Sequence, residues 1–178
     1  MRLLSILSTL LLLSLSQVFA QRTTADCQNA IPVCQNIYQQ TVAAANGGNV
    51  VELNPANQGC LGGENRTTWY VINVVKDGIL VFTLTPTGQT TDYDFAMWDA
   101  TGKACAPRGC DYVNNNLPVR CNYAGLGTTP PNGQTGLSTT ALNPSENAGG
   151  PSFSSAINAK AGETYILLID NFSNNTTG

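Results

Sequence analysis

The sequence predicts an all-β fold, an antiparallel β-sandwich with disulfide-tied loops. First, three apolar, β-branched and aromatic runs follow one another over residues 68–99, and each is closed by Gly, Asp or Pro, which predicts a meander of strands. Second, the side chains alternate within these runs, so that Leu80, Phe82 and Leu84 would share one face of a strand. Third, the chain carries six cysteines, and an even number favours disulfides in an exported protein.

The first twenty residues have the layout of a secretory signal peptide. Arg2 supplies a positive start, residues 3–15 form an apolar run interrupted only by Ser and Thr, and residues 18–20 offer a small-residue cleavage site. The apolar run is shorter than the ~20 residues of a membrane-spanning helix, which weighs against a membrane anchor. We therefore expect a signal peptide over residues 1–20, no membrane span after its removal, and one β-sandwich domain over residues 21–178.

The composition indicates a neutral polar surface. The 178 residues carry a net charge of −3, only 11% of them are charged, and histidine is absent. Such a surface presents neither a basic face for nucleic acid nor a polybasic patch for a membrane. It is typical of exported adhesive or carbohydrate-contacting modules, so the expected partners are surface glycans or proteins, neighbouring domains or other subunits.

The cysteines fall into two groups on either side of the apolar runs: Cys27, Cys34 and Cys60 before them, and Cys105, Cys110 and Cys121 after them. Spacing alone does not decide among the many possible pairings. Because each group has an odd number, either at least one disulfide crosses between the groups or two thiols stay free. Zinc binding is disfavoured, since the sequence has no CxxC pair and no histidine.

Before the apolar runs, only short elements are expected. Pro32 prevents a long helix over residues 21–49, so a turn or short helical piece tied by Cys27 and Cys34 is predicted there. Residues 50–53 are predicted as a first short strand.

The segment after the apolar runs is predicted as mostly irregular. Residues 103–116 read as a loop with cysteines and asparagines, and residues 117–120 as a brief edge strand, because proline is tolerated mainly at sheet edges. Residues 122–150 are rich in Gly, Thr, Pro and Asn, which indicates either a functional or disulfide-tied loop or a long ordered connection.

Regular structure is predicted to resume with strands over residues 152–158 and 164–170. In the second of these, both sets of alternating side chains are mostly apolar, as in a central strand buried on both faces. Because no strand follows it in this sequence, we expect the chain to be a fragment that lacks a last strand.

Six motifs, which span most of the chain after the signal segment, carry a resemblance to a known family. They are GEN-x-TTWYVI at residues 63–72, G-x-L-x-F-T-L-x-P at 78–86, DYDFA-x-W at 92–98, PVRCNYAG at 118–125, TGL at 135–137 and GETYILLIDNFS at 162–173. Together they resemble a module found near the N-termini of large secreted proteins of Bacteroidetes.

This resemblance implies a surface module with a β-sandwich fold. Such proteins often carry gliding-motility-associated or type IX secretion sorting domains at their far C-termini, and the module usually continues into a glycine-plus-aromatic strand after its DNFS motif. Neither feature is found in this sequence. The strand order and the D-Y-D strand are also similar, more loosely, to CUB domains and to the pre-peptidase C-terminal jelly roll. Both are accessory binding sandwiches that can hold calcium, so the resemblance implies a jelly-roll or CUB-like arrangement.

The residues do not assemble a catalytic set. Without histidine, Ser-His-Asp and Cys-His arrangements are impossible in this sequence. The cysteines are expected to be oxidised, which leaves no catalytic thiolate, and nothing indicates a cleft with paired carboxylates. We therefore expect no enzymatic activity from this chain.

The best candidate for a metal site is a pair of aspartates, Asp92 and Asp94, on one face of the third run. Two unpaired carboxylates repel each other, and a hard cation with oxygen ligands would relieve that repulsion. Asp170 would join them if the last strand packs nearby, and further oxygens could come from Asp99, Asn171 and Glu64. The sequence thus predicts a calcium site at Asp92, Asp94 and Asp170, and the alternative is that the aspartates face water at a strand edge, where salt screens the repulsion.

Aromatic residues suggest a contact surface for sugars, because flat rings pack on the apolar faces of sugars. Trp69 and Trp98 lie in predicted strands and are more typical of core. Tyr112 and Tyr123 lie in the loop region and are the predicted ligand-contacting residues.

Two functions are compatible with these observations. The first is a non-catalytic extracellular or cell-surface module for adhesion, filament assembly or glycan and protein binding within a larger exported protein. The alternative is an accessory, pre-peptidase-like domain of a secreted hydrolase whose catalytic part lies outside this chain. A protease or glycosidase motif downstream would favour the second function, and repeats or a sorting domain the first.

Overall fold

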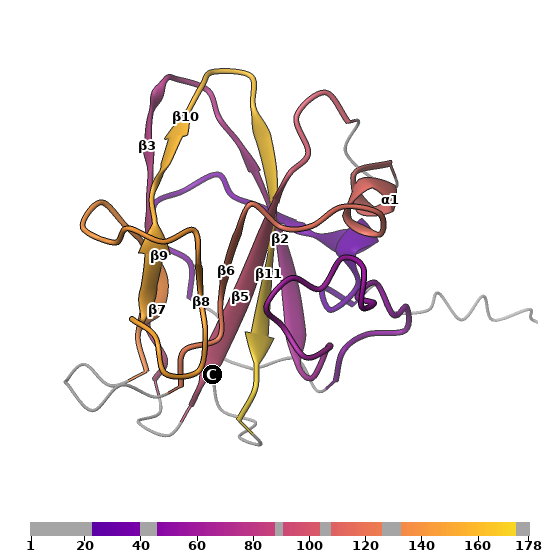
Figure 1. The fold of residues 1–178 in the computed structure, drawn as a ribbon. Coiled ribbons are helices and arrows are strands. Elements are labelled where there is room, and N and C mark those ends of the chain that lie inside the picture. Colours follow the sequence, from indigo (N-terminus) through magenta and orange to yellow (C-terminus); the bar gives the residue numbers. More distant parts are fainter. Residues whose placement is uncertain (1–22, 40–45, 88–90, 104–107, 126–132, 174–178) are drawn as a thin grey trace, which may run out of the picture.

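The computed structural model describes residues 23–39, 46–87, 91–103, 108–125 and 133–173. These residues form eleven β-strands and two short helices (Figure 1), namely the 3-10 helix η1 (Cys27–Asn29) and the α-helix α1 (Arg108–Val113). The all-β class predicted from the sequence is therefore confirmed. No described helix has the length and apolar character needed to cross a bilayer. The predicted signal peptide lies outside the described residues.

A mixed sheet of six strands forms the middle of the molecule, in the order β1-β2-β11-β5-β6-β8. Its strands are β1 (Ile31–Pro32), β2 (Thr67–Asn73), β5 (Tyr93–Asp99), β6 (Arg120–Asn122), β8 (Ser145–Glu146) and β11 (Thr164–Asn171). β11 pairs antiparallel with β2 on one side and with β5 on the other, so the predicted central strand is confirmed. The edge strands β1 and β8 pair in parallel with their neighbours, whereas the sequence predicts antiparallel pairing throughout.

A smaller layer packs on one face of this central sheet (Figure 1). Its strands are β3 (Gly78–Leu80), β4 (Phe82–Leu84), β7 (Thr135–Ser138), β9 (Phe153–Ser155) and β10 (Ile157–Ala159). β3 pairs antiparallel with β10, whereas β7 lies between β4 and β9, antiparallel to the first and parallel to the second. Single residues separate β3 from β4 and β9 from β10. β3 and β4 therefore form one nearly continuous strand, and β9 and β10 form another. These two strands pair directly at one end of the layer, through β3 and β10, and at the other end β7 lies between β4 and β9.

The core of the sandwich fills the space between the two layers. Phe95 and Met97 of β5 are fully buried there. Phe82 of the smaller layer meets Phe95 edge to face, with ring centroids 5.1 Å apart, and Leu80 and Leu84 pack against the same core. The alternation of side chains predicted for this run is confirmed.

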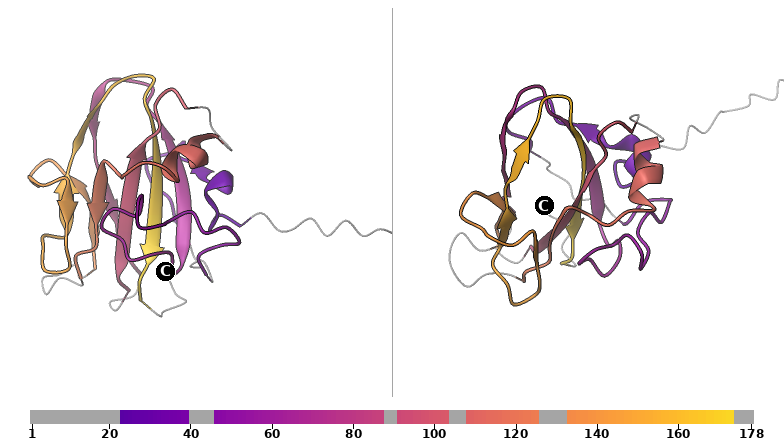
Figure 2. Two further views of the ribbon diagram at one scale, coloured as in Figure 1. Left: turned by 45° about the vertical axis from the view of Figure 1, so that its right-hand side comes forward. Right: turned by 45° about the horizontal axis from the view of Figure 1, so that its top comes forward.

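A second core lies on the other face of the central sheet (Figure 2), where it is covered by loops and the two helices. We call this covering the outer layer; it consists of residues 23–30, 46–65 and 108–117. Trp69 of β2 and Trp98 of β5 are fully buried beneath it and stack with ring centroids 5.7 Å apart. The central strands are apolar on both faces because each face of the sheet is covered.

Two disulfides hold the outer layer together and fasten it to the central sheet, because the first joins η1 to α1 within the layer and the second joins residue 60 of the layer to β6. They are Cys27–Cys110 and Cys60–Cys121. Each bond crosses from the cysteines before the apolar runs to those after them, which is one of the two outcomes expected from the odd number in each group. Cys34 differs from the prediction, because its thiol is exposed and free in the structure and does not tie η1. Cys105 lies outside the described residues.

The three runs over residues 68–99 form strands but not a meander. β2 and β5 do not pair with each other, because β11 lies between them. The run between them, which becomes β3 and β4, crosses to the smaller layer. The pairing differs from a meander because β11, which is far from both strands in the sequence, offers two apolar faces and fits between β2 and β5.

Three local predictions also differ from the structure. Residues 50–53 form no strand, since Val51 is exposed and the amide of Glu52 binds the Glu64 carboxylate. Part of the predicted loop over residues 103–116 is helix α1. The predicted edge strand over residues 117–120 begins only at Arg120, and it lies inside the sheet between β5 and β8.

Candidate functional site

The structure brings the three predicted metal-binding aspartates together at one end of the central sheet. Asp94 of β5 lies directly opposite Asp170 of β11, and both are buried. Asp92 lies just before β5, is partly buried, and acts electrostatically on Asp94. We call these three residues the acidic cluster. The face of β5 that carries Asp94 also carries Trp98, so the cluster lies on the side of the sheet that the outer layer covers.

Asp170 is already engaged by hydrogen bonds from the start of β2. Its Oδ1 accepts the backbone N–H groups of Asn65 at 2.9 Å and Arg66 at 3.0 Å. Its Oδ2 accepts the side-chain amide of Asn65 at 2.7 Å. Burial raises the pKa of Asp170, although these donors favour its charged form. Asp170 therefore joins the end of β11 to the start of β2.

Asp94 differs from Asp170, because hydrogen bonds do not compensate a negative charge on both of its carboxyl oxygens. Its Oδ1 is buried and has no hydrogen-bond partner in the structure. Burial, together with the neighbouring charges of Asp92 and Asp170, raises the pKa of Asp94 to about 8. A carboxyl group in this position holds a proton at neutral pH unless a cation replaces it.

The other oxygen ligands considered for this site do not join it. Asp99 lies at the far end of β5, where its Oδ1 accepts the Thr101 N–H. Asn171 follows Asp170 on β11 and so points to the opposite face of the sheet. Glu64 faces Glu52 and not the acidic cluster.

Within the described ranges, no group of three or more His, Cys, Asp or Glu side chains is placed to hold a metal ion. The engagement of Asp170 by Asn65 and Arg66 is one physical reason, because its oxygens are directed toward those donors. A cation at the acidic cluster would have to compete for them. The calcium site therefore stays a prediction.

The two predicted ligand-contacting tyrosines lie on different segments. Tyr112 belongs to α1, packs partly against the core beneath the outer layer, and has the Lys103 ammonium 5.6 Å from the centre of its ring. Tyr123 follows β6 and is 37% exposed. Of the two rings, Tyr123 is therefore the better placed to touch a ligand. The prediction that Trp69 and Trp98 are core residues is confirmed.

One cavity among the described residues lies beside the Cys27–Cys110 disulfide. It has a volume of about 170 Å³ and is bordered by Val71 of β2 and Ile166 of β11. Lys103 is the one ionisable side chain among the described residues that line it. Small-molecule sites usually enclose roughly 300–1,000 Å³ and several convergent polar groups. Apart from the Lys103 amine, the described lining of this cavity has few groups that could bind or react with a ligand.

The outer layer also holds a pair of acidic side chains, Glu52 and Glu64, that the sequence pattern does not predict as a pair. Glu52 is 4% exposed, and burial raises its pKa. Burial and the charge of Glu52 raise the pKa of Glu64 to about 8. A signal was present, because Glu52 interrupts a short apolar run in a chain where acidic residues are scarce. The partner on the far side of a loop could not be read from spacing.

Comparison with known proteins gives no match: no protein-family model, no curated protein and no solved structure is similar to this chain at a significant level.

Proposed function

We propose that this chain is a non-catalytic module of an exported protein and that its outer layer contacts surface glycans or proteins. The observation that carries the proposal is the pair of disulfides, Cys27–Cys110 and Cys60–Cys121. The first links two segments of the irregular outer layer to each other, and the second links that layer to β6 of a sheet that is already covered on its other face by the sandwich core. Loops held on a rigid scaffold are the usual carriers of binding residues.

Export is supported by two independent features. Disulfides persist in oxidising environments and are rare in the cytosol. The first twenty residues have the charge, apolar run and cleavage site of a signal peptide. The resemblance to secreted Bacteroidetes modules points in the same direction and supports adhesion or filament assembly as the specific role.

The lack of catalysis is supported by the residues that are present. The sequence has no histidine to act as a general base. The cavity beside Cys27–Cys110 is small and lined mainly by apolar groups. Acid–base chemistry needs titratable groups converging on a substrate-sized space, and the described residues offer no such arrangement.

Two measurements test this proposal. N-terminal sequencing of the mature protein from the producing cell should begin at Gln21, and the protein should be found outside the cytoplasm. A glycan array should show binding by the oxidised domain that is lost in the Cys27→Ala/Cys110→Ala variant, because that change frees η1 from α1. An intact N-terminus in the cytoplasm, or turnover in a broad hydrolase screen, would contradict the proposal.

We also propose that the acidic cluster binds calcium. The support is the buried, unpartnered Oδ1 of Asp94 beside two further carboxyl groups. Calcium that binds only the folded state stabilises it by about 2.7 kcal/mol when its concentration is about 100 times its Kd. Thermal melting should therefore shift upward in millimolar calcium and return after addition of a chelator.

The matched control for calcium is Asp94→Asn, which keeps the shape of the side chain and removes its charge. This variant should show no calcium-dependent shift in melting temperature. Equal melting of the unmodified protein with calcium and with chelator would rule the site out.

A further inference from the structure

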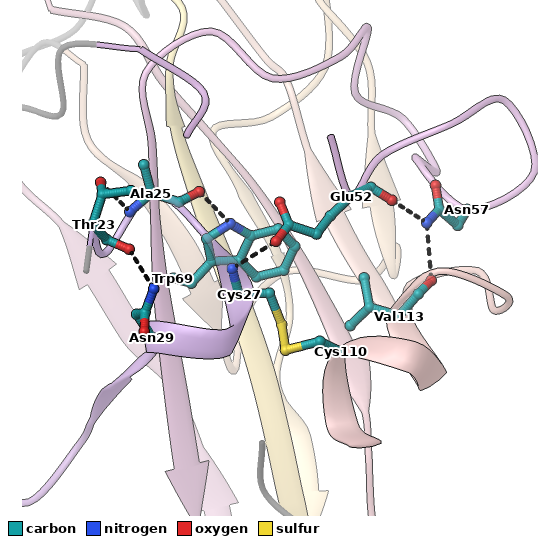
Figure 3. The surroundings of a disulfide bond; sticks show 9 residues. All are labelled: Thr23, Ala25, Cys27, Asn29, Glu52, Asn57, Trp69, Cys110 and Val113. Carbon is teal, nitrogen blue, oxygen red and sulfur yellow. Dashed lines mark hydrogen bonds between the residues drawn. A yellow bond between two sulfur atoms is a disulfide. The ribbon is translucent and has the colours of Figure 1, made fainter. Parts of the chain in front are cut away.

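Glu52 and Glu64 face each other in the outer layer through a small set of hydrogen bonds. Glu64 Oε2 accepts the Glu52 N–H at 3.1 Å. Glu52 Oε1 accepts the Cys27 N–H at 2.9 Å (Figure 3). The remaining oxygens, Glu52 Oε2 and Glu64 Oε1, are buried and have no partner in the structure. Each carboxyl group therefore has one oxygen that accepts a hydrogen bond and one oxygen without a partner.

Among the described residues, the charged groups that act on this pair are acidic. The further charged group that acts on Glu52 is Asp26, which is also acidic. The Asp26 carboxylate is occupied by the N–H groups of Asn49 at 2.6 Å and Val50 at 3.0 Å. Two adjacent carboxylates in such a place repel each other, and one proton between them removes the repulsion and gives both free oxygens a partner.

The pair lies where three parts of the outer layer meet. Close packing in this corner is shown by Gly47, where a Cβ would lie 2.9 Å from the Cβ of Glu64. Gly48 adopts a φ of +97°, and a Cβ there would lie 2.1 Å from Asp26 Oδ1. Figure 3 shows that Glu52 lies beside the Trp69 indole and the Cys27–Cys110 disulfide. A change in the position or charge of this pair should therefore affect the packing of the indole and of the disulfide.

We propose that Glu52 and Glu64 form a proton-dependent latch, in which one shared proton fastens residues 46–64 to the segment that carries Cys27, and loss of that proton loosens this corner. The latch is independent of the function proposed above, because it rests on contacts within the fold.

The direction of the pH effect follows from linkage. Burial and the charge of Glu52 raise the pKa of Glu64 from 4.5 to about 8. The closed latch therefore binds more protons than the opened one between these values. The latch is tightest below about pH 4.5, weakens as the pH rises through this window, and changes no further above about pH 8.

Amide hydrogen exchange at Cys27 and Glu52 tests the latch, because both N–H groups are bound by the pair. After correction for intrinsic exchange, the opening equilibrium at these amides should rise by up to about tenfold per pH unit between pH 5 and 8. The amide of Ala100, which binds the Thr164 carbonyl at 2.8 Å, is the reference and should not follow. A slope at Ala100 equal to that at Cys27 would show global unfolding and overturn the proposal.

The matched variant is Glu64→Gln, whose amide keeps the size of the side chain and donates an N–H to Glu52 without titrating. The pH slope at Cys27 should vanish in this variant and persist in Asp94→Asn, which removes a carboxyl group outside the latch whose pKa is also raised to about 8. A slope that survives in Glu64→Gln would overturn the proposal. A slope that disappears when millimolar calcium is added to the unmodified protein would also overturn it, since a metal ion would then replace the proton.

Reduction of the disulfides gives a second readout. With a phosphine reductant, the rate of Cys27–Cys110 cleavage relative to Cys60–Cys121 cleavage, followed by mass spectrometry, should rise by up to about tenfold per pH unit between pH 5 and 8. The same ratio should stay constant in Glu64→Gln. A constant ratio in the unmodified protein would contradict the latch.

Discussion

At the scale of single residues, Asp170 has the largest number of specific contacts in the candidate site. Its carboxylate accepts three hydrogen bonds from Asn65 and Arg66, so it fixes where β2 begins relative to the end of β11. Hydrogen bonds to a buried charged acceptor are stronger than neutral ones. Loss of such an acceptor leaves buried donors unpaired, which is more costly than the mean value of one bond.

We predict that Asp170→Asn destabilises the protein by about 1–3 kcal/mol, because one of its acceptor oxygens becomes an amide that faces the Asn65 amide. Urea denaturation at neutral pH measures the change. The control is Asp77→Asn, which removes a carboxylate from an exposed ion pair with Lys160. That control should change the stability by less than about 0.5 kcal/mol, and equal losses in both variants would contradict the structural role of Asp170.

Alternation along a strand made several residue-scale predictions reliable. The face shared by Asp94 and Trp98 follows from a period of two along β5, and both side chains are buried in the structure. The burial of Trp69 was expected because aromatic residues in strands are typical of core. Hydrogen bonds between loops have no such period. The pairing of Glu52 with Glu64, and the capture of Asp170 by Asn65, therefore had no counterpart in the sequence pattern.

At the scale of elements, β7 acts as a spacer between β4 and β9. Gly136 in the middle of β7 has a φ of +150°, and a Cβ at this position would lie 2.1 Å from the carbonyl oxygen of Phe82 on β4. The backbones of β7 and β4 approach closely there because glycine has no side chain. The position of the smaller layer over the sandwich core depends on this contact.

We predict that Gly136→Ala separates β7 from β4 and lowers the stability by about 2–4 kcal/mol, through backbone strain and lost packing of Phe82. Chemical denaturation followed by circular dichroism measures it. Gly78→Ala on β3 is the matched control, because a Cβ at Gly78 meets nothing within 4 Å. A Gly136 variant as stable as the Gly78 variant would show that β7 does not set the spacing.

The existence of long strands was predictable, whereas their partners were not. Runs of apolar residues identified β2, β5 and β11, and the two apolar faces of β11 indicated a central position. The insertion of β11 between β2 and β5 depends on contacts between residues far apart in sequence. Short strands such as β7 and β8 gave no clear pattern, because their few residues are set by tertiary contacts and not by propensity.

At the scale of the whole molecule, the described chain has two cores on opposite faces of one sheet. The sandwich core contains no sulfur from cysteine, whereas all four disulfide-bonded cysteines lie in or against the core beneath the outer layer. The two faces are therefore stabilised differently, one by packing between strands and the other by packing plus covalent links.

We predict that Cys27→Ala/Cys110→Ala destabilises the protein by about 4 kcal/mol, because the bond spans 83 residues of sequence and restricts the unfolded chain. Urea denaturation gives the size of the loss. Near-ultraviolet circular dichroism should also lose intensity from the Trp69–Trp98 stack, while the far-ultraviolet signal of the strands persists. An unchanged near-ultraviolet signal would show that the disulfide does not hold the outer layer over the tryptophans.

Global features followed from the sequence only in part. The odd number of cysteines on each side of the strands allowed bonds that cross between the groups, and both described bonds do so. The partners could not be deduced, because they depend on how loops fold over a sheet. The outer layer was not predicted as a layer, since its segments are short and irregular and are scattered over the sequence.

Because both described disulfides lie on one face of the central sheet, the two faces of the molecule would respond differently to a reductant. In a reducing medium the outer layer would loosen first, because its disulfides would be cleaved. The sandwich core would keep its structure, because packing between strands stabilises it. In an oxidising medium the disulfides form, and the outer layer stays attached to the central sheet. The covalent links of the outer layer therefore depend on an oxidising environment, whereas the sandwich core does not.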